Sequence, residues 1–262
     1  MSHDLTPILA GWDHDPDELQ VRIVPGDDGR DKLQMRIDLG LIQMEIAGRP
    51  DGQKPSGFES LLDYHEHRAR HGRADADGGP SADFALDSEA CAGLMREGVQ
   101  YYHRYLAAFH LERYDLVARD TGRNLRLFAF ARRHATRQRD KVQFDQYRPY
   151  VTMMLARSLG LQALARDDYR EALTRIDEGI DGIRAFLDDY DQGDQEAECM
   201  ELGFLLRWKS ELERERPIGP VERLEQQLDL AVATEDFEEA ARIRDQLRRL
   251  RGGEVSARPN PT

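Results

Sequence analysis

The chain has 262 residues, of which 40% are hydrophobic and 33% are charged, and its formal net charge is −13. This composition is typical of a soluble, helix-rich protein with enough material for a real core, and its acidity disfavours broad contact with nucleic-acid phosphates. Two distant cysteines, Cys91 and Cys199, disfavour a disulfide framework and a thiolate zinc site. The first residues lack the pattern of a signal peptide, and no apolar run approaches the roughly 20 residues of a membrane helix. We therefore expect a cytoplasmic protein without membrane contact.

The segment from Leu19 to Gly48 alternates between apolar and polar residues. Period-two patterning places one face of a strand in a core and the other in water. The alternation is interrupted near Asp28-Gly29 and again at Gly40, where tight turns are expected. These features predict a three-stranded antiparallel meander. Its apolar members are Val21, Ile23, Leu33, Met35, Ile37, Leu39, Ile42, Met44 and Ile46.

A helix is expected to cover this sheet. Ser56-Gly57-Phe58-Glu59 has the capping-box pattern and predicts a helix that continues to about His71. Periodicity then stops in a stretch rich in glycine, aspartate and alanine. We take residues 1–71 as a small β-meander with a covering helix, and residues 72–86 as a linker.

Residues 87–214 show helical periodicity almost throughout and predict an antiparallel helical bundle. The expected helices are 87–111, 114–139, 150–165, 168–190 and 195–212. Leu159-Gly160, Ala163, Asp168-Tyr169 and Ala172 resemble a tetratricopeptide (TPR) helix pair, in which small residues let two helices approach closely. A weaker echo at Tyr105, Ala108, Tyr114 and Val117 is spaced more widely than the roughly 34-residue TPR unit. The TPR-like bundle would offer a groove for a peptide.

No known catalytic motif occurs in the sequence, which has no phosphate-binding loop, dinucleotide fingerprint, nucleophile elbow or HExxH zinc motif. His67 and His71 are spaced to supply two metal ligands and His65 lies nearby, but further ligands are not evident. We interpret this helix as a solvated polar face. We therefore predict no catalytic residue, no metal and no cofactor.

The predicted helix at 114–139 is rich in arginine. With two phenylalanines it could form a basic strip for nucleic acid, and this is the main alternative function. The competing interpretation, which we favour, is a solvated face balanced by acidic residues elsewhere. The arginines are Arg119, Arg123, Arg126, Arg132, Arg133, Arg137 and Arg139.

Residues 221–251 predict a helical hairpin, which Pro217 and Pro220 separate from the bundle. Two apolar stripes flank a polar break, and Asp236 is placed to cap the second helix. A hairpin of this size does not bury both stripes by itself and requires a partner. Residues 252–262 are predicted to be a disordered tail.

This hairpin resembles the UVR motif shared by the B and C subunits of bacterial nucleotide excision repair. Similar hairpins occur in Clp-type ATPases and in the activator of a bacterial arginine-kinase stress system. The resemblance implies a protein-docking element, with Phe237 as the large anchor. The matching residues are Leu224, Leu228, Ala231, Asp236-Phe237-Glu238, Ala240-Ala241, Arg244-Asp245, Leu247 and Leu250.

The sequence as a whole predicts an α+β fold in which helices predominate. We expect a non-enzymatic adaptor in a DNA-repair or Clp-type quality-control context. Its partner would be a protein with a UVR-type hairpin or a second copy of the chain, while direct contact with nucleic acid is not expected. The partner-binding residues are predicted to be Leu224, Leu228, Phe237, Ala240, Ala241, Arg244 and Leu247.

Overall fold

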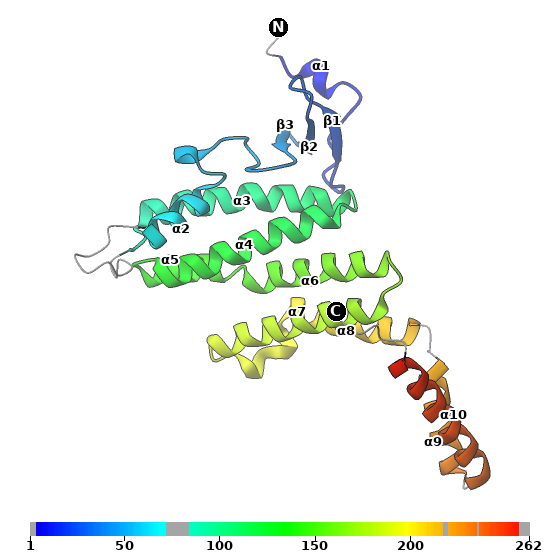
Figure 1. Ribbon diagram of the computed structural model, residues 1–262. Helices are drawn as coiled ribbons and strands as arrows, with labels where there is room; N and C mark the ends of the chain where they lie inside the picture. Colours follow the sequence, from blue (N-terminus) through cyan, green and yellow to red (C-terminus); the bar gives the residue numbers. More distant parts are fainter. Residues whose placement is uncertain (1–3, 72–83, 217–219, 235, 257–262) are drawn as a thin grey trace. The chain divides into compact units, whose positions relative to one another are not determined.

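The computed structural model describes residues 4–71, 84–216, 220–234 and 236–256. Within these residues the chain is mainly helical, with one small sheet near the N-terminus and a helix pair near the C-terminus (Figure 1). The predicted α+β class, with helices predominating, is confirmed. The chain forms two compact units, residues 1–212 and residues 213–262. None of the helices in the described part of the chain is long and apolar enough to span a membrane.

In the first unit a short helix, α1 (Thr6–Leu9), precedes the sheet. This helix was not predicted from the sequence. Strands β1 (Val21–Pro25), β2 (Asp31–Ile37) and β3 (Gly40–Glu45) are antiparallel and adjacent in chain order. Met35 on the central strand pairs with Val21 on one side and with Ile42 on the other. The predicted meander and both of its turns are therefore confirmed.

The apolar face of the sheet packs on the helices. Leu33, Met35 and Met44 are buried together with Ala107, which belongs to helix α3 (Ser88–His110). Half of each strand's residues point toward this face, as the alternation predicts.

The alternation predicted that the opposite face of the central strand would be in water, but in the structure this face is buried. Lys32 and Gln34 are only 7% and 6% exposed. Arg22 donates from Nε to Gln34 Oε1 at 2.8 Å, and Gln34 donates from Nε2 to Gln43 Oε1 at 2.9 Å. The guanidinium of Arg22 also stacks on Trp12, 3.9 Å from the ring centroid. A polar side chain is buried at low cost when it is hydrogen bonded, and this ladder satisfies that condition.

Helix α2 (Leu61–His71) packs on α3 and not on the sheet that it was predicted to cover, because α3 already occupies the apolar face of the sheet. It also starts later than predicted. A 3-10 helix, η1 (Pro55–Gly57), precedes it, and Ser60 caps it in place of Ser56. The Ser60 hydroxyl oxygen accepts a hydrogen bond from Asp63 N at 3.1 Å. Ser56 has φ +52° and lies within the 3-10 turn, where it does not cap α2.

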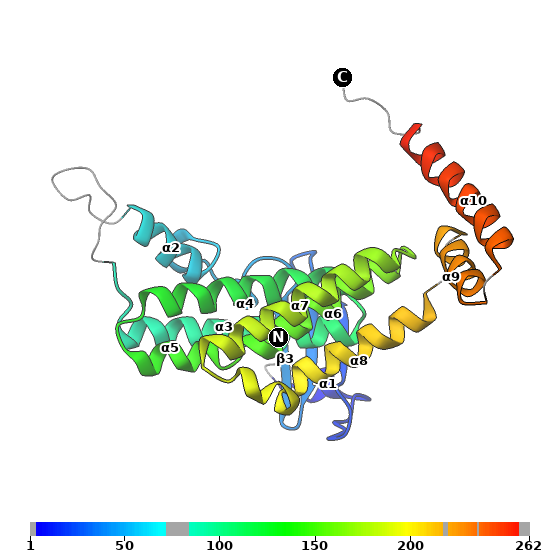
Figure 2. The same cartoon turned by 90° about the horizontal axis from the view of Figure 1, so that it is seen from below.

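The bundle stacks its helices in chain order: α4 (Tyr114–His134) lies between α3 and α6 (Arg148–Leu164), and α7 (Tyr169–Asp189) lies beyond α6 (Figures 1 and 2). Helices α6 and α7 pack against each other, and Ala163 and Ala172, two small residues of the predicted TPR-like pair, are both fully buried. Asp168 caps α7 by accepting from Glu171 N at 2.9 Å. The helices that follow α3 are α4 (Tyr114–His134), α5 (Gln138–Asp145), α6 (Arg148–Leu164), α7 (Tyr169–Asp189), the 3-10 helix η2 (Gly193–Glu198) and α8 (Met200–Glu215).

Helix α4 ends at His134, whereas the sequence predicted one helix to residue 139. A parallel bridge between Leu86 and Ala135 interrupts it, in which Leu86 N donates to His134 O at 2.8 Å and Thr136 N donates to Leu86 O at 3.0 Å. Leu86 is 1% exposed, so the end of the predicted linker belongs to the core. Residues 72–83 of that linker lie outside the described residues.

Close packing between α6 and α7 depends on a glycine. A Cβ added at Gly179 would stand 2.5 Å from Ala156 Cβ, whereas a Cβ added at Gly122 would meet no atom within 4 Å. Because overpacking costs about 1–3 kcal/mol and a helical alanine is favoured over glycine by about 1 kcal/mol, Gly179→Ala is expected to destabilise the first unit. Gly122→Ala, the matched control, is expected to stabilise it by about 0.5–1 kcal/mol.

The urea midpoint of each variant, followed by tryptophan fluorescence, measures both effects. Trp12 and Trp208 both lie in the first unit, so their fluorescence reports on that unit. An equal rise in both midpoints would contradict the close approach at Gly179.

The second unit contains α9 (Pro220–Ala233) and α10 (Phe237–Ser256), which pair as a hairpin. The predicted break between the two helices is confirmed. Helix α10 continues to Ser256, beyond the predicted end at residue 251 and into the segment predicted as a disordered tail. The rest of that segment, residues 257–262, lies outside the described residues.

Candidate functional site

The inner surface of the hairpin is a small apolar cluster. Ala231, Ala240, Ile243 and Leu247 are 3–8% exposed, and the half-buried Leu224 and Leu228 pack against them. Of the residues predicted to bind a partner, Leu224, Leu228, Ala240 and Leu247 therefore hold the two helices of the hairpin together. The sequence analysis did not select Ile243, although its spacing from Ala240 and Leu247 fits the same helical stripe.

The remaining predicted residues face outward. Phe237 is 70% exposed, and Ala241 and Arg244 are also exposed. Their i, i+4, i+7 spacing places them on one stripe of α10. An exposed phenylalanine beside a small residue and a guanidinium is the composition of an interface anchor. Leu230 is also exposed, at 65%, and lies on α9 one residue before the inward-facing Ala231.

The turn that carries Phe237 is held by local hydrogen bonds. Asp236 accepts from Glu239 N at 3.1 Å, as predicted for its capping role, and its own backbone N–H donates to Ala231 O at 2.8 Å. Thr234 donates from Oγ1 to Leu230 O at 2.9 Å. The start of α10, and with it the position of Phe237, is therefore defined by the hairpin itself.

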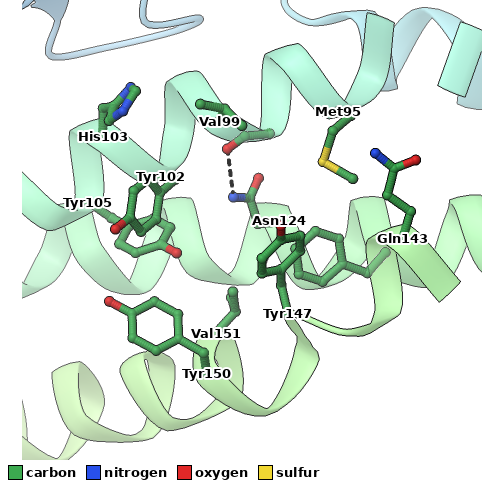
Figure 3. Close-up of a pocket in the computed structure, with 12 residues that line it drawn as sticks. Met95, Val99, Tyr102, His103, Tyr105, Asn124, Gln143, Tyr147, Tyr150 and Val151 are labelled. Carbon is green, nitrogen blue, oxygen red and sulfur yellow. Dashed lines mark hydrogen bonds between the residues drawn. The ribbon is translucent and has the colours of Figure 1, made fainter. Parts of the chain in front are cut away.

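A second candidate site is a cleft of about 550 Å³ in the first unit. Figure 3 shows Tyr102 and Tyr105 of α3 near Tyr150 of α6, and Met95 near Gln143 of α5. Asn124 of α4 contributes to its floor. The remaining lining residues are Gly98, Val99, His103, Phe128, Tyr147 and Val151.

The floor of the cleft is fixed by buried hydrogen bonds. Asn124 is 2% exposed, donates from Nδ2 to Gly98 O at 3.0 Å and accepts from Arg123 Nη1 at 3.0 Å. Burial raises the pKa of Tyr105 and Tyr150, so both hydroxyls keep their protons at neutral pH. The cleft thus lies between α3 and α6, with α4 as its floor, and it does not include α7, the second helix of the predicted TPR-like pair.

The arginine-rich strip is largely neutralised. Arg133 and Arg137 are exposed, but the other members have carboxylates within ion-pair distance. This pairing agrees with the interpretation of a balanced face and gives no support to nucleic-acid binding. The pairs are Arg119–Asp120, Arg123–Glu97, Arg126–Asp63, Arg126–Glu66, Arg132–Asp189 and Arg139–Asp140.

The three histidines of α2 do not point toward one common position where a metal ion could bind. His65 is 6% exposed and packs on Tyr64 and Phe84, while His67 stacks on His71 with ring centroids 4.5 Å apart. Burial lowers the pKa of His65, so it is neutral at pH 7. Within the described ranges, no group of three His, Cys, Asp or Glu side chains is placed to hold a metal ion.

Two further histidines, His103 and His134, lie on α3 and α4. His103 lines the cleft, and His134 lies against Phe84 and Phe130. Burial lowers the pKa of both imidazoles.

Comparison with known proteins identifies the hairpin. A family model described as the UvrB/uvrC motif matches residues 220–252, which are α9 and most of α10. This match confirms the resemblance predicted from the sequence. No curated protein and no solved structure matches the chain. The hairpin is therefore a UVR motif, and the first unit is a sheet and helical bundle without a matching relative.

Proposed function

We propose that the chain is a non-enzymatic adaptor that docks a protein partner through its UVR hairpin. The observation that supports this proposal is the 70% exposure of Phe237 on a motif of this family. A large aromatic ring in water is unfavourable, and covering it in a complex recovers that free energy. The exposed Phe237, Ala241 and Arg244 contact the partner, while the inner cluster keeps the hairpin in shape.

A second UVR hairpin is the partner that fits this surface. Small residues on α10 allow close approach of another helix, and an isologous pair of hairpins would place the two Phe237 rings in one shared interface. The partner hairpin belongs either to another copy of the chain or to a protein of DNA repair or of Clp-type quality control. The motif match supports both contexts.

Phe237→Ala is expected to weaken docking at least tenfold without loss of helix, because the removed ring makes few contacts within its own chain. The labelled full-length chain is titrated with unlabelled chain, and separately with purified UvrB, and fluorescence anisotropy is measured. Wild type is expected to bind at least one of the two.

Leu230→Ala is the matched control, because Leu230 is 65% exposed but belongs to α9 and lies outside the Phe237 stripe. It is expected to bind within twofold of wild type. Circular dichroism checks that both variants keep their helix content. Equal binding by wild type and Phe237→Ala, or an equal loss in the two variants, would contradict docking through this stripe.

A further inference from the structure

Aromatic and polar side chains flank the cleft between α3 and α6 at both ends. At one end the rings of Tyr102 and Tyr150 lie 6.4 Å apart, within the range of aromatic contact. Farther along the same two helices, the Arg157 guanidinium lies 4.4 Å from the Phe109 ring centroid. At the other end Gln143 and Tyr147, from α5 and the turn after it, form the wall (Figure 3). A cleft flanked in this way suits a compact molecule better than an extended peptide.

The size of the cleft suits a small molecule. Its volume of about 550 Å³ lies inside the range of roughly 300–1,000 Å³ typical of ligand sites. Tyr105 and Val151 are only 1% and 2% exposed at its base, whereas Val99 and Tyr147 are 43% and 49% exposed at its rim. The cleft therefore has depth and an entrance.

The lining carries no formal charge at neutral pH. Among the residues that the structure describes, no Asp, Glu, Lys or Arg side chain lines the cleft, and burial lowers the pKa of His103 so that its imidazole is neutral. A charged ligand would lose its hydration here without gaining a counter-charge, which is costly. An uncharged ligand avoids this cost.

Several polar groups in the lining remain available to a ligand. In the part of the chain that the structure describes, the hydroxyls of Tyr102, Tyr105 and Tyr150 have no hydrogen-bond partner, and neither does the Gln143 side-chain amide. They stand among aromatic and aliphatic side chains. A few polar groups in an apolar cleft fix the orientation of a ligand.

We propose that this cleft binds a small, uncharged aromatic molecule that carries a hydrogen-bonding group. The aromatic body stacks against the tyrosine rings and Phe128, and its polar group bonds to a tyrosine hydroxyl or to Gln143. This site is separate from the hairpin and does not depend on partner docking.

A matched pair of fluorescent probes tests the charge preference. N-phenyl-1-naphthylamine is uncharged and has two aromatic parts joined by one N–H. 8-Anilino-1-naphthalenesulfonate has the same skeleton with an added sulfonate. Titration of the full-length chain with each probe is expected to show saturable one-to-one binding of the uncharged compound, at least tenfold tighter than binding of the sulfonate. Equal affinities would overturn the proposal.

Val99→Arg places a positive charge at the entrance and is expected to reduce the preference for the uncharged probe at least tenfold. Val142→Arg is the matched control, because Val142 is 39% exposed on α5 and does not line the cleft. Its preference is expected to stay within twofold of wild type. The same change in both variants would show a general charge effect and overturn the assignment to the cleft.

Two further measurements exclude other sites and other ligands. Phe237→Ala is expected to bind the uncharged probe as wild type does, and loss of binding would place the probe on the hairpin. A capped glycine-serine heptapeptide with one central tryptophan is compared with N-acetyltryptophanamide as a competitor. If the heptapeptide competes at least tenfold better, the occupant is a polypeptide segment and the small-molecule proposal is wrong.

Discussion

Replacement of Arg104 by leucine is expected to lower the free energy of unfolding of the first unit by about 3–5 kcal/mol, because it leaves the buried carboxylate of Asp120 without its buried partner. Arg104 is fully buried and donates two hydrogen bonds to Asp120, from Nε to Oδ2 at 2.7 Å and from Nη2 to Oδ1 at 2.9 Å. Its Nη1 donates to Glu45 O and to Gly48 O, both at 2.8 Å. The variant therefore removes four hydrogen bonds and takes the buried ion-pair partner from the carboxylate of Asp120.

Urea unfolding followed by tryptophan fluorescence measures this effect. Arg119→Leu is the control, because Arg119 also pairs with Asp120 but its side chain is 41% exposed, and exposed pairs contribute about 0–1 kcal/mol. The double variant Arg104→Leu/Asp120→Leu is expected to recover part of the lost free energy of unfolding, since it leaves no buried carboxylate at this position. Equal losses for the variants at Arg104 and Arg119 would be inconsistent with a buried ion pair.

Replacement of Glu97 by glutamine is expected to cost about 3 kcal/mol and to loosen α2. Glu97 is fully buried on α3, and its carboxylate accepts from Leu61 N at 2.7 Å and from Leu62 N at 3.1 Å. Arg123 donates to it, and Arg49 Nε lies 3.2 Å from Oε2. The carboxylate satisfies free N–H groups in the first turn of α2, where a negative charge is also favoured by the helix dipole.

Amide hydrogen exchange gives a local measure of this second effect. Exchange in α2 is expected to accelerate in Glu97→Gln more than exchange in α6 or α7, because the side-chain N–H₂ cannot accept from the backbone. Asp63→Asn is the control, because Asp63 lies on α2 but is 36% exposed and contributes about 0–1 kcal/mol. Unchanged exchange at Leu61 and Leu62 in Glu97→Gln would contradict the capping role of Glu97.

Local patterns predicted the elements whose causes lie within a short stretch of chain. The alternation through Leu33 and Met35 was enough to predict the strands, and the turn residues set the pairing of Met35 with Ile42. The same holds for Asp168 and Asp236, whose capping depends on amides three residues ahead.

Elements that depend on distant partners were placed less accurately. The predicted cap of α2 was Ser56, whereas the structure uses Ser60, and the helix that starts there meets Glu97. The end of α4 at His134 depends on a bridge to Leu86, far away in the sequence. Neither contact leaves a local signal that periodicity can detect.

The two candidate sites differ in the same way. The hairpin could be found from sequence because its spacing is continuous, although the spacing did not separate the inward Leu247 from the outward Phe237. The cleft could not be found, because its lining comes from four helices. Val99 and Tyr102 both belong to α3, and only the fold shows that they border a cleft.

The contacts of Arg104 also make the sheet and the bundle depend on each other. One guanidinium on α3 holds both an acid on α4 and the carbonyls that follow β3. A gene rearrangement that copied the helices without the sheet would keep the charge pair but lose two of its four acceptors. We therefore expect homologous genes to retain the sheet and the bundle together.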